Sequence, residues 1–251
     1  MKTQYWLILG LATVVGVVVF AETWHRNQLC TGLIVNLDKE AQYPFFDEQD
    51  VKNLANGKES LDNILLSTID LKAVEERVKA NRLIKSCQVS RNLFGNLLIN
   101  IEQQRPIARL INTSSELNSY VYAGGRYLTD TGAVIPLSGK FTARTVLVSG
   151  TFFRDLNNIK TKNGQNLLKL LIKIDQDSFW KAQIAELQVD EAGEITISPQ
   201  VGTHVIEFGS ADGFEAKFNK LKIFYKKILP IQGWEKYSKV SVKFRNQIVC
   251  Q

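Results

Sequence analysis

The chain has 251 residues, of which 45% are hydrophobic and 22% are charged. This length and composition suffice for one or two globular domains with cores of their own, and they exclude a disordered chain. The formal net charge is +6 but uneven, because residues 214–251 carry nine Lys or Arg against two Glu. This basic segment fits an acidic protein, a membrane surface or nucleic acid as a partner, and equally an ordinary solvated surface.

The N-terminal segment has the pattern of a membrane anchor. Residues 5–21 contain no charged side chain, follow Lys2 and end at Glu22. This length is at the lower limit for a helix that spans a bilayer. Aromatic rings that suit the two interfaces lie near its ends, at Tyr5, Trp6 and Trp24.

The charge before this segment sets its orientation. Because the basic residue precedes the uncharged run, we predict a cytoplasmic tail over residues 1–4, a single transmembrane helix over residues 5–24 and the bulk of the chain outside the cytoplasm. The alternative is a cleaved signal peptide, since the small residues Val19 and Ala21 precede a cut before Glu22.

Residues 31–106 predict a small module with the order β-α-α-β-β. After a strand at 31–38, Asp47 can cap a helix that ends at Gly57. Asp70 can cap a second helix, because its short carboxylate accepts the free amides of the first turn. Two alternating strands follow, joined by a turn at Gly95. Their predicted inward residues are Cys87, Val89, Leu97, Ile99 and Ile101.

The remaining residues predict a mostly antiparallel β-domain with flanking helices. Strands are expected at 107–111, 120–122, 127–128, 134–136, 145–148, 184–189, 195–197, 204–208 and 239–245. Helices are expected at 165–174 and 214–228, the second ended by Pro230 and Gly233. The expected buried stripe of the second helix is Phe214, Phe218, Leu221, Tyr225 and Ile228.

No motif for catalysis, a metal or a cofactor is present in the sequence. The two histidines, His25 and His204, lie far from any nucleophile motif, and a lone His in a strand is usually structural. Cys30, Cys87 and Cys250 form no ligand-like cluster. Cys87 is predicted to be a core thiol, with a Cys30–Cys87 bridge as the alternative. The pattern indicates an anchored binding protein and not an enzyme, and the predicted anchor argues against nucleic acid as a partner.

The last predicted strand is the candidate binding surface. A terminal strand often lies at a sheet edge, where unpaired amides and carbonyls can bind a partner strand. Val240, Val242 and Phe244 are expected to face inward. Ser241, Lys243 and Arg245 are expected to face outward, which is the side a partner would meet.

These elements in this order resemble the bacterial cell-division protein family FtsQ (DivIB). The resemblance covers nearly the whole chain and is carried by its order together with local matches. These are residues 70–75, 82–89, 96–99 and 105–108, the strand, turn and Pro-Leu-Ser pattern of residues 127–138, the strand at 146–150, and residues 237–249.

The resemblance implies a fold and a role. Residues 28–104 would be a POTRA domain and residues 105–251 the C-terminal β-domain of an α+β protein anchored in the inner membrane at the division septum. It would be a non-catalytic divisome scaffold without a cofactor, linking early and late division proteins. Its partners would be an FtsB/FtsL-like pair and other divisome components. The partner-binding residues carried over are Tyr237, Lys239, Val240, Val242, Lys243 and Phe244.

The sequence also departs from the family pattern near its end. Residues 241–244 replace the usual Asp-Leu-Arg-Tyr, so Phe244 lacks a hydroxyl and Lys243 lacks the planar fork of Arg. Two other readings stay open. One is an envelope-assembly or chaperone-like protein that uses its POTRA domain, and the other is an anchored periplasmic enzyme without a recognisable motif.

Overall fold

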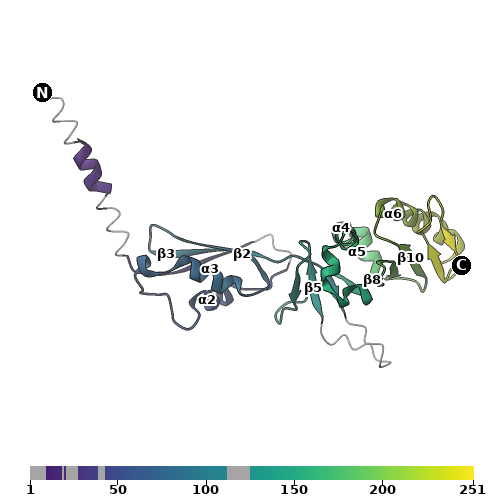
Figure 1. The fold of residues 1–251 in the computed structure, drawn as a ribbon, viewed down its shortest axis with the longest axis horizontal. Helices are drawn as coiled ribbons and strands as arrows, with labels where there is room; N and C mark the ends of the chain where they lie inside the picture. Colours follow the sequence, from purple (N-terminus) through teal and green to yellow (C-terminus); the bar gives the residue numbers. More distant parts are fainter. Residues whose placement is uncertain (1–9, 19, 21–27, 39–42, 112–124) are drawn as a thin grey trace. The chain divides into compact units, whose positions relative to one another are not determined.

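The computed structural model describes residues 10–18, 20, 28–38, 43–111 and 125–251 (Figure 1). Residues 10–18 are helical. Within the described residues, no helix is both long enough and apolar enough to cross a membrane. The predicted tail and parts of the predicted transmembrane helix lie outside the described residues, as does the strand predicted at 120–122.

The chain divides into two compact units, unit 1 (Met1–Gln104) and unit 2 (Arg105–Gln251). Unit 1 has the β-α-α-β-β order with one short 3₁₀ turn added. Its strands form a three-stranded sheet in the order β1-β3-β2, in which β1 is parallel and β2 antiparallel to β3. The elements are β1 (Gly32–Leu37), α2 (Glu48–Asn56), η1 (Leu66–Thr68), α3 (Leu71–Lys79), β2 (Ile84–Arg91) and β3 (Asn96–Gln103).

Both predicted helix caps of unit 1 are confirmed. The Asp47 carboxylate accepts from the backbone N–H of Asp50 at 2.8 Å, and the Asp50 carboxylate accepts from the N–H of Asp47 at 3.0 Å. This reciprocal pair satisfies two amides at the start of α2. Asp70 caps α3 by accepting from the N–H groups of Lys72 and Ala73.

The predicted alternation of the two strands is also confirmed. Cys87 and Val89 of β2 and Leu97, Ile99 and Ile101 of β3 are all buried, as are Val51 of α2 and Val74 and Val78 of α3. The helices therefore cover one face of the small sheet. Cys30 and Cys87 are free thiols, so the alternative of a bridge between them is not realised. Burial raises the pKa of the Cys87 thiol to about 11.

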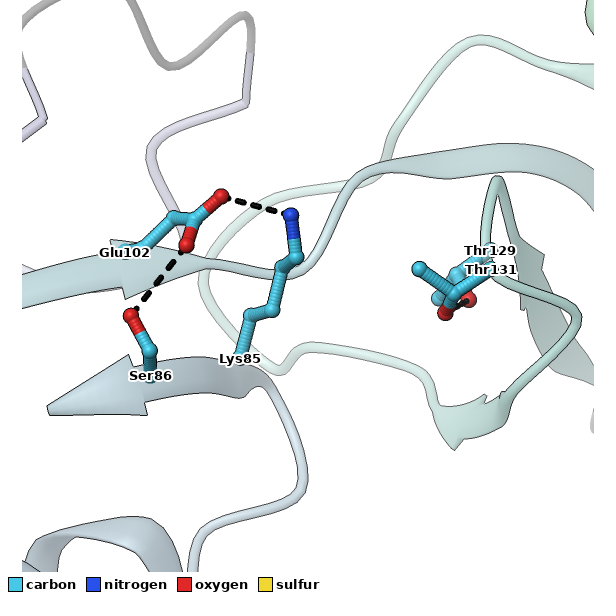
Figure 2. A network of polar contacts seen from close by, with 5 residues as sticks. All are labelled: Lys85, Ser86, Glu102, Thr129 and Thr131. Atoms are coloured by element: carbon cyan, nitrogen blue, oxygen red, sulfur yellow. Dashed lines mark hydrogen bonds and ion pairs between the residues drawn. The ribbon is translucent and has the colours of Figure 1, made fainter.

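A small polar network closes the other end of the β2–β3 pair, away from its turn (Figure 2). Glu102 accepts from the Lys85 ammonium at 2.6 Å and from the Ser86 hydroxyl at 3.2 Å. The hydrogen bond from Lys85 lowers the pKa of Glu102. In unit 2 the hydroxyls of Thr129 and Thr131 lie 2.9 Å apart. Thr129 also accepts from the N–H of Ala133, which fixes the tight turn of the Thr-Asp-Thr-Gly segment.

Unit 2 is built on a mixed sheet. Among the described residues the sheet has nine strands in the order β12-β11-β10-β9-β8-β7-β4-β5-β6. Five of the eight neighbouring pairs are antiparallel, and three are parallel. The strands are β4 (Pro106–Leu110), β5 (Arg126–Thr129), β6 (Val134–Pro136), β7 (Val146–Ser149), β8 (Ile184–Val189), β9 (Ile195–Pro199), β10 (Val205–Gly209), β11 (Lys239–Ser241) and β12 (Val249–Cys250).

Helices pack against this sheet. The helix predicted at 165–174 is present and longer, and the helix predicted at 214–228 is divided into α6, a π-helical turn and α7. The 3₁₀ turns and the helix α5 were not predicted. The elements are η2 (Thr151–Arg154), η3 (Leu156–Lys160), α4 (Lys162–Gln176), α5 (Ser178–Gln183), α6 (Phe214–Ile223), the π-helical turn η4 (Phe224–Ile228) and α7 (Leu229–Gln232).

The helices and the sheet share one hydrophobic core. It includes Leu167 and Leu171 of α4, Trp180 of α5, and Phe208 of β10. An ion triad ties the first residue of unit 2 to these helices. Asp175, almost fully buried, binds Arg105 at 2.9 Å and Lys181 at 2.7 Å. A charge buried this far needs such partners, so the triad links α4, α5 and the residue before β4.

The buried stripe predicted for residues 214–228 is partly wrong. Phe218, Leu221 and Tyr225 are buried, but Phe214 and Ile228 are only half-buried. Phe224 and Leu229 are buried as well. The π-helical turn explains the change at Ile228 and Leu229, because its wider turn rotates these residues relative to a regular helix, whereas Phe214 is half-buried as the first residue of α6.

Candidate partner-binding surface

The sheet of unit 2 ends in three short strands. β11 is parallel to β10, and β12 is antiparallel to β11. Backbone bonds hold β11 on both sides. The N–H of Val242 donates to Glu207 of β10 at 3.0 Å, and Lys239 and Gln251 exchange both of their backbone bonds across the β12 side. β11 therefore presents no free edge, and β12 is the outer strand.

This arrangement corrects the prediction of a terminal edge strand over 239–245. The strand stops at Ser241, and residues 242–248 lie outside any strand before β12 begins. β10 continues to Gly209, but its pairing with β11 ends at Glu207 and Ser241, where β10 has a register irregularity between Glu207 and Gly209. Asn246 then adopts a left-handed conformation, with φ of 58°, and lets the chain turn back.

The predicted binding residues divide into two groups. Val240 and Val242 are fully buried and belong to the core beneath the edge. Ser241 is buried as well, which contradicts its predicted outward position. Phe244 was expected to face inward, but 44% of its side chain is exposed. Burial on both faces replaces the alternation that the sequence predicted.

Two other predicted residues, Lys239 and Lys243, lie beside Glu207. Its carboxylate binds the ammonium groups of Lys239 at 2.5 Å and Lys243 at 3.7 Å. The hydrogen bond from Lys239 lowers the pKa of Glu207. Lys243 also lies 5.3 Å from the centre of the Phe244 ring, where its charge meets the negative face of the ring. These groups form a compact charged and aromatic surface next to β11.

Lys220 of α6 holds the segment that leaves β11. Its ammonium group donates to the carbonyl oxygens of Val242 and Phe244, the second at 2.5 Å. Burial lowers the pKa of this lysine. Because Lys220 occupies these two carbonyl groups, they are already bonded within the chain, and a partner strand would have to pair elsewhere.

Other lysines of the basic segment also have structural partners. Lys217 donates to the carbonyl of Ser210 at 2.6 Å and lies over the ring of Phe208. Lys222 lies 3.9 Å from Asp177 and over the ring of Trp180. Lys217, Lys220 and Lys222 of the basic segment therefore fasten α6 to its neighbours.

An aromatic cluster supports the surface from below. Nε2 of His204 lies 3.1 Å from the hydroxyl of Tyr225, and both residues are buried. Burial lowers the pKa of His204 and raises that of Tyr225 to about 12, so both are neutral at physiological pH. Tyr237, half-buried, packs 6.1 Å from Phe224 between ring centres. The prediction that His204 is structural agrees with this burial and pairing.

The free edge of this surface is the backbone of β12, which the sequence analysis missed. Since Lys239 and Gln251 form a hydrogen-bonded pair, the antiparallel pattern directs the N–H and C=O of Cys250 away from β11. A strand of two residues is too short to give a periodic signal. The one usable sign was Asn246, a residue type that favours a reversal of the chain.

Within the described residues, no group of three or more His, Cys, Asp or Glu is placed to hold a metal ion. The family model described as FtsQ/DivIB, C-terminal related, matches residues 105–251, which is more than half of the chain and coincides with unit 2. A search of curated protein sequences gave no match. Because this match covers all of unit 2, unit 2 is a cell-division domain, and the chain belongs to the FtsQ/DivIB family.

Proposed function

We propose that the protein is a non-catalytic scaffold of the cell-division machinery that stands at the division septum and binds an FtsB/FtsL-like pair through the end of its nine-stranded sheet. The observation that supports this function is the open backbone edge of β12 beside the exposed Lys243 and Phe244. Such an edge pairs with an extended peptide, while neighbouring side chains select the partner.

The proposed contact differs from the one expected from sequence. The main-chain contact lies at Cys250, and Tyr237, Lys239, Lys243 and Phe244 contribute accessible side chains beside it. Val240 and Val242 support this surface from the core and do not touch the partner. A proline at Val242 would remove the N–H that donates to Glu207, so it would test the fold and not the binding.

A proline at Cys250 is a sharper test of strand addition. It removes an N–H that points away from β11 and leaves the bonds between Lys239 and Gln251 in place. We expect C250P to lose capture of a purified FtsB/FtsL-like pair while unit 2 keeps its melting temperature. The matched control is C250S, which keeps the N–H. Equal capture by C250P and C250S would refute strand addition at β12.

Two side-chain variants test the surface next to the edge. Lys243→Glu reverses a charge beside Glu207, and Phe244→Ala removes the exposed ring. Both should weaken capture of the same pair. Lys226→Glu, an exposed charge reversal on η4, is the matched control and should bind as the unchanged protein does. A loss in both charge reversals with normal capture by Phe244→Ala would point to net charge and not to this surface.

We further propose that residues 5–24 anchor the chain in the inner membrane with residues 1–4 in the cytoplasm, and that residues 28–104 are a POTRA domain. The uncharged run over residues 5–21 supports the anchor, and the helix-covered sheet of unit 1 supports the domain. An N-terminal fluorescent fusion should give a ring at midcell. A uniform membrane signal would refute the septal role, and a mature N-terminus at Glu22 would refute the anchor.

A further inference from the structure

The turn between β2 and β3 carries two adjacent apolar side chains in solvent. Leu93 is 71% exposed and Phe94 is 81% exposed. Neither side chain covers the core of unit 1, which lies between the helices and the sheet. Turns surrounded by water usually consist of polar residues. An exposed leucine and phenylalanine therefore indicate that this turn contacts another molecule or a membrane.

This turn packs against residues 28–31, which directly precede β1. The N–H of Thr31 donates to the carbonyl of Gly95 at 2.9 Å, and its hydroxyl donates to the carbonyl of Phe94 at 3.3 Å. Gly95 has φ of 86°, and a side chain there would come within 3.1 Å of the carbonyl of Leu29. The glycine thus permits both the turn and its close approach to residues 28–31.

Two more leucines extend the apolar surface. Leu29 and Leu65 form an isolated antiparallel bridge, and they are 48% and 41% exposed. With Leu93 and Phe94 they make up what we call the apolar tip of unit 1. The exposed charges nearest in sequence to Leu65 and Leu93 are Asp62 and Arg91, which have opposite signs. The tip is therefore apolar without a net charge that would attract anionic groups.

The sequence places this tip close to the proposed membrane anchor. Seven residue steps join Ala21, the end of the uncharged run, to Gln28, and whatever their conformation they reach at most about 25 Å. Gln28 itself contacts the turn, since its side-chain amide donates to the carbonyl of Leu93 at 3.5 Å. The opposite end of β3 leads on to residue 105, so the tip lies at the end of the small sheet where Gln28 enters, which is the end nearest in sequence to the proposed anchor.

We propose that the apolar tip inserts into the headgroup region of the membrane that holds the N-terminal segment. This inference rests on the proposed anchor and adds a second contact with the lipid. Moving Phe and Leu side chains from water to the boundary between headgroups and acyl chains lowers the free energy. This transfer accounts for apolar side chains that the protein itself leaves exposed. Because the charges of Asp62 and Arg91 have opposite signs and cancel, the contact should form equally on zwitterionic and anionic lipids.

The test uses the full chain reconstituted in phosphatidylcholine vesicles, with and without an anionic lipid. A nitroxide label is placed at position 94 in F94C and, as the matched control, at position 82 in R82C, an exposed site at the other end of β2. Both carry C250S. Cys30 and Cys87 are buried with raised pKa values, so they react slowly. Power saturation compares collisions with oxygen, which concentrates in lipid, and with a water-soluble nickel chelate.

We expect the label at position 94 to lose most of its collisions with the nickel chelate and to gain collisions with oxygen, in both lipid mixtures, while position 82 behaves as a site in water. If the protein floats with the vesicles but the labels at positions 94 and 82 show equal collision rates with both relaxants, the tip contact is overturned and the anchor stands. Protection at position 94 from both relaxants would also overturn it, in favour of a protein contact. Protein that does not float with the vesicles would refute the anchor itself.

Discussion

Replacing Lys220 with methionine should loosen the end of the sheet on which the proposed partner contact depends. Methionine keeps the length and apolar stem of the side chain and removes the ammonium group that binds the carbonyls of Val242 and Phe244. Hydrogen bonds from a charged group contribute about 1.5–3 kcal/mol each. The burial that lowers the pKa of Lys220 offsets part of this gain.

The net loss should be about 2 kcal/mol in the free energy of unfolding, because one of the two carbonyls is exposed and regains water. For a unit the size of unit 2, this corresponds to a fall of about 6 °C in Tm. Thermal unfolding followed by circular dichroism measures this fall. Lys226→Met is the control, since Lys226 is exposed on the same helical segment and should change stability by less than about 0.5 kcal/mol.

Amide hydrogen exchange adds a local measurement to this test. The amides of Lys239 and Gln251, which bond across β11 and β12, should exchange faster in K220M than in K226M. Equal melting temperatures and equal exchange in the two variants would show that Lys220 does not hold the segment after β11, and the assignment of β12 as a supported edge would then fail.

Four further changes test other parts of the structure. Asp70→Ala should cost about 1 kcal/mol in a urea titration, because two amides of α3 lose their acceptor; an unchanged midpoint would contradict the cap. The pKa of Glu207 is lowered in the folded state, so its stabilisation is complete above an unfolded-state pKa of about 4.3 and is lost as the pH falls through the folded value. Glu207→Gln should therefore reduce stability at neutral pH and flatten its acid dependence, and parallel urea midpoints between about pH 3 and pH 7 for both proteins would argue against this clamp. Gly150→Ala should cost about 3 kcal/mol or more, since φ is 113° and the added carbon would lie 2.0 Å from a backbone oxygen, while Gly139→Ala meets open space and should be neutral. The Cys87 thiol, with a pKa of about 11, should react with a thiol reagent at neutral pH only after unfolding, and prompt reaction in the native protein would contradict its burial.

The sequence predicted those parts of the fold whose signals are local. Asp47 and Asp70 each stand one residue before a helix and accept its first amides, so a cap is readable without knowledge of the rest of the chain. The alternation of Leu97, Ile99 and Ile101 is likewise local, since one face of the strand meets the helices.

The candidate site depends on contacts between residues that are far apart in the sequence, which local sequence patterns do not predict. Residues 239–245 alternate as a strand would, but the pairing stops at Ser241, opposite the register irregularity that β10 has between Glu207 and Gly209. The partners of Glu207 come from residues more than thirty positions later in the chain, and Lys220 reaches a segment beyond a second helix. Such contacts follow from the order of strands in the sheet, which residue spacing does not determine.

The short pairing between β11 and β12 has a mechanical consequence. A partner strand added at Cys250 would be joined to the rest of the sheet through the two paired residues of β12 and the bonds of Gln251. Tension along the strands would load these bonds together, whereas a pull at right angles would open them one after another, because the bonds run perpendicular to the strands. Under load, this junction would yield before the long β8–β9 ladder, so the edge itself limits the force that a bound partner can transmit to the scaffold.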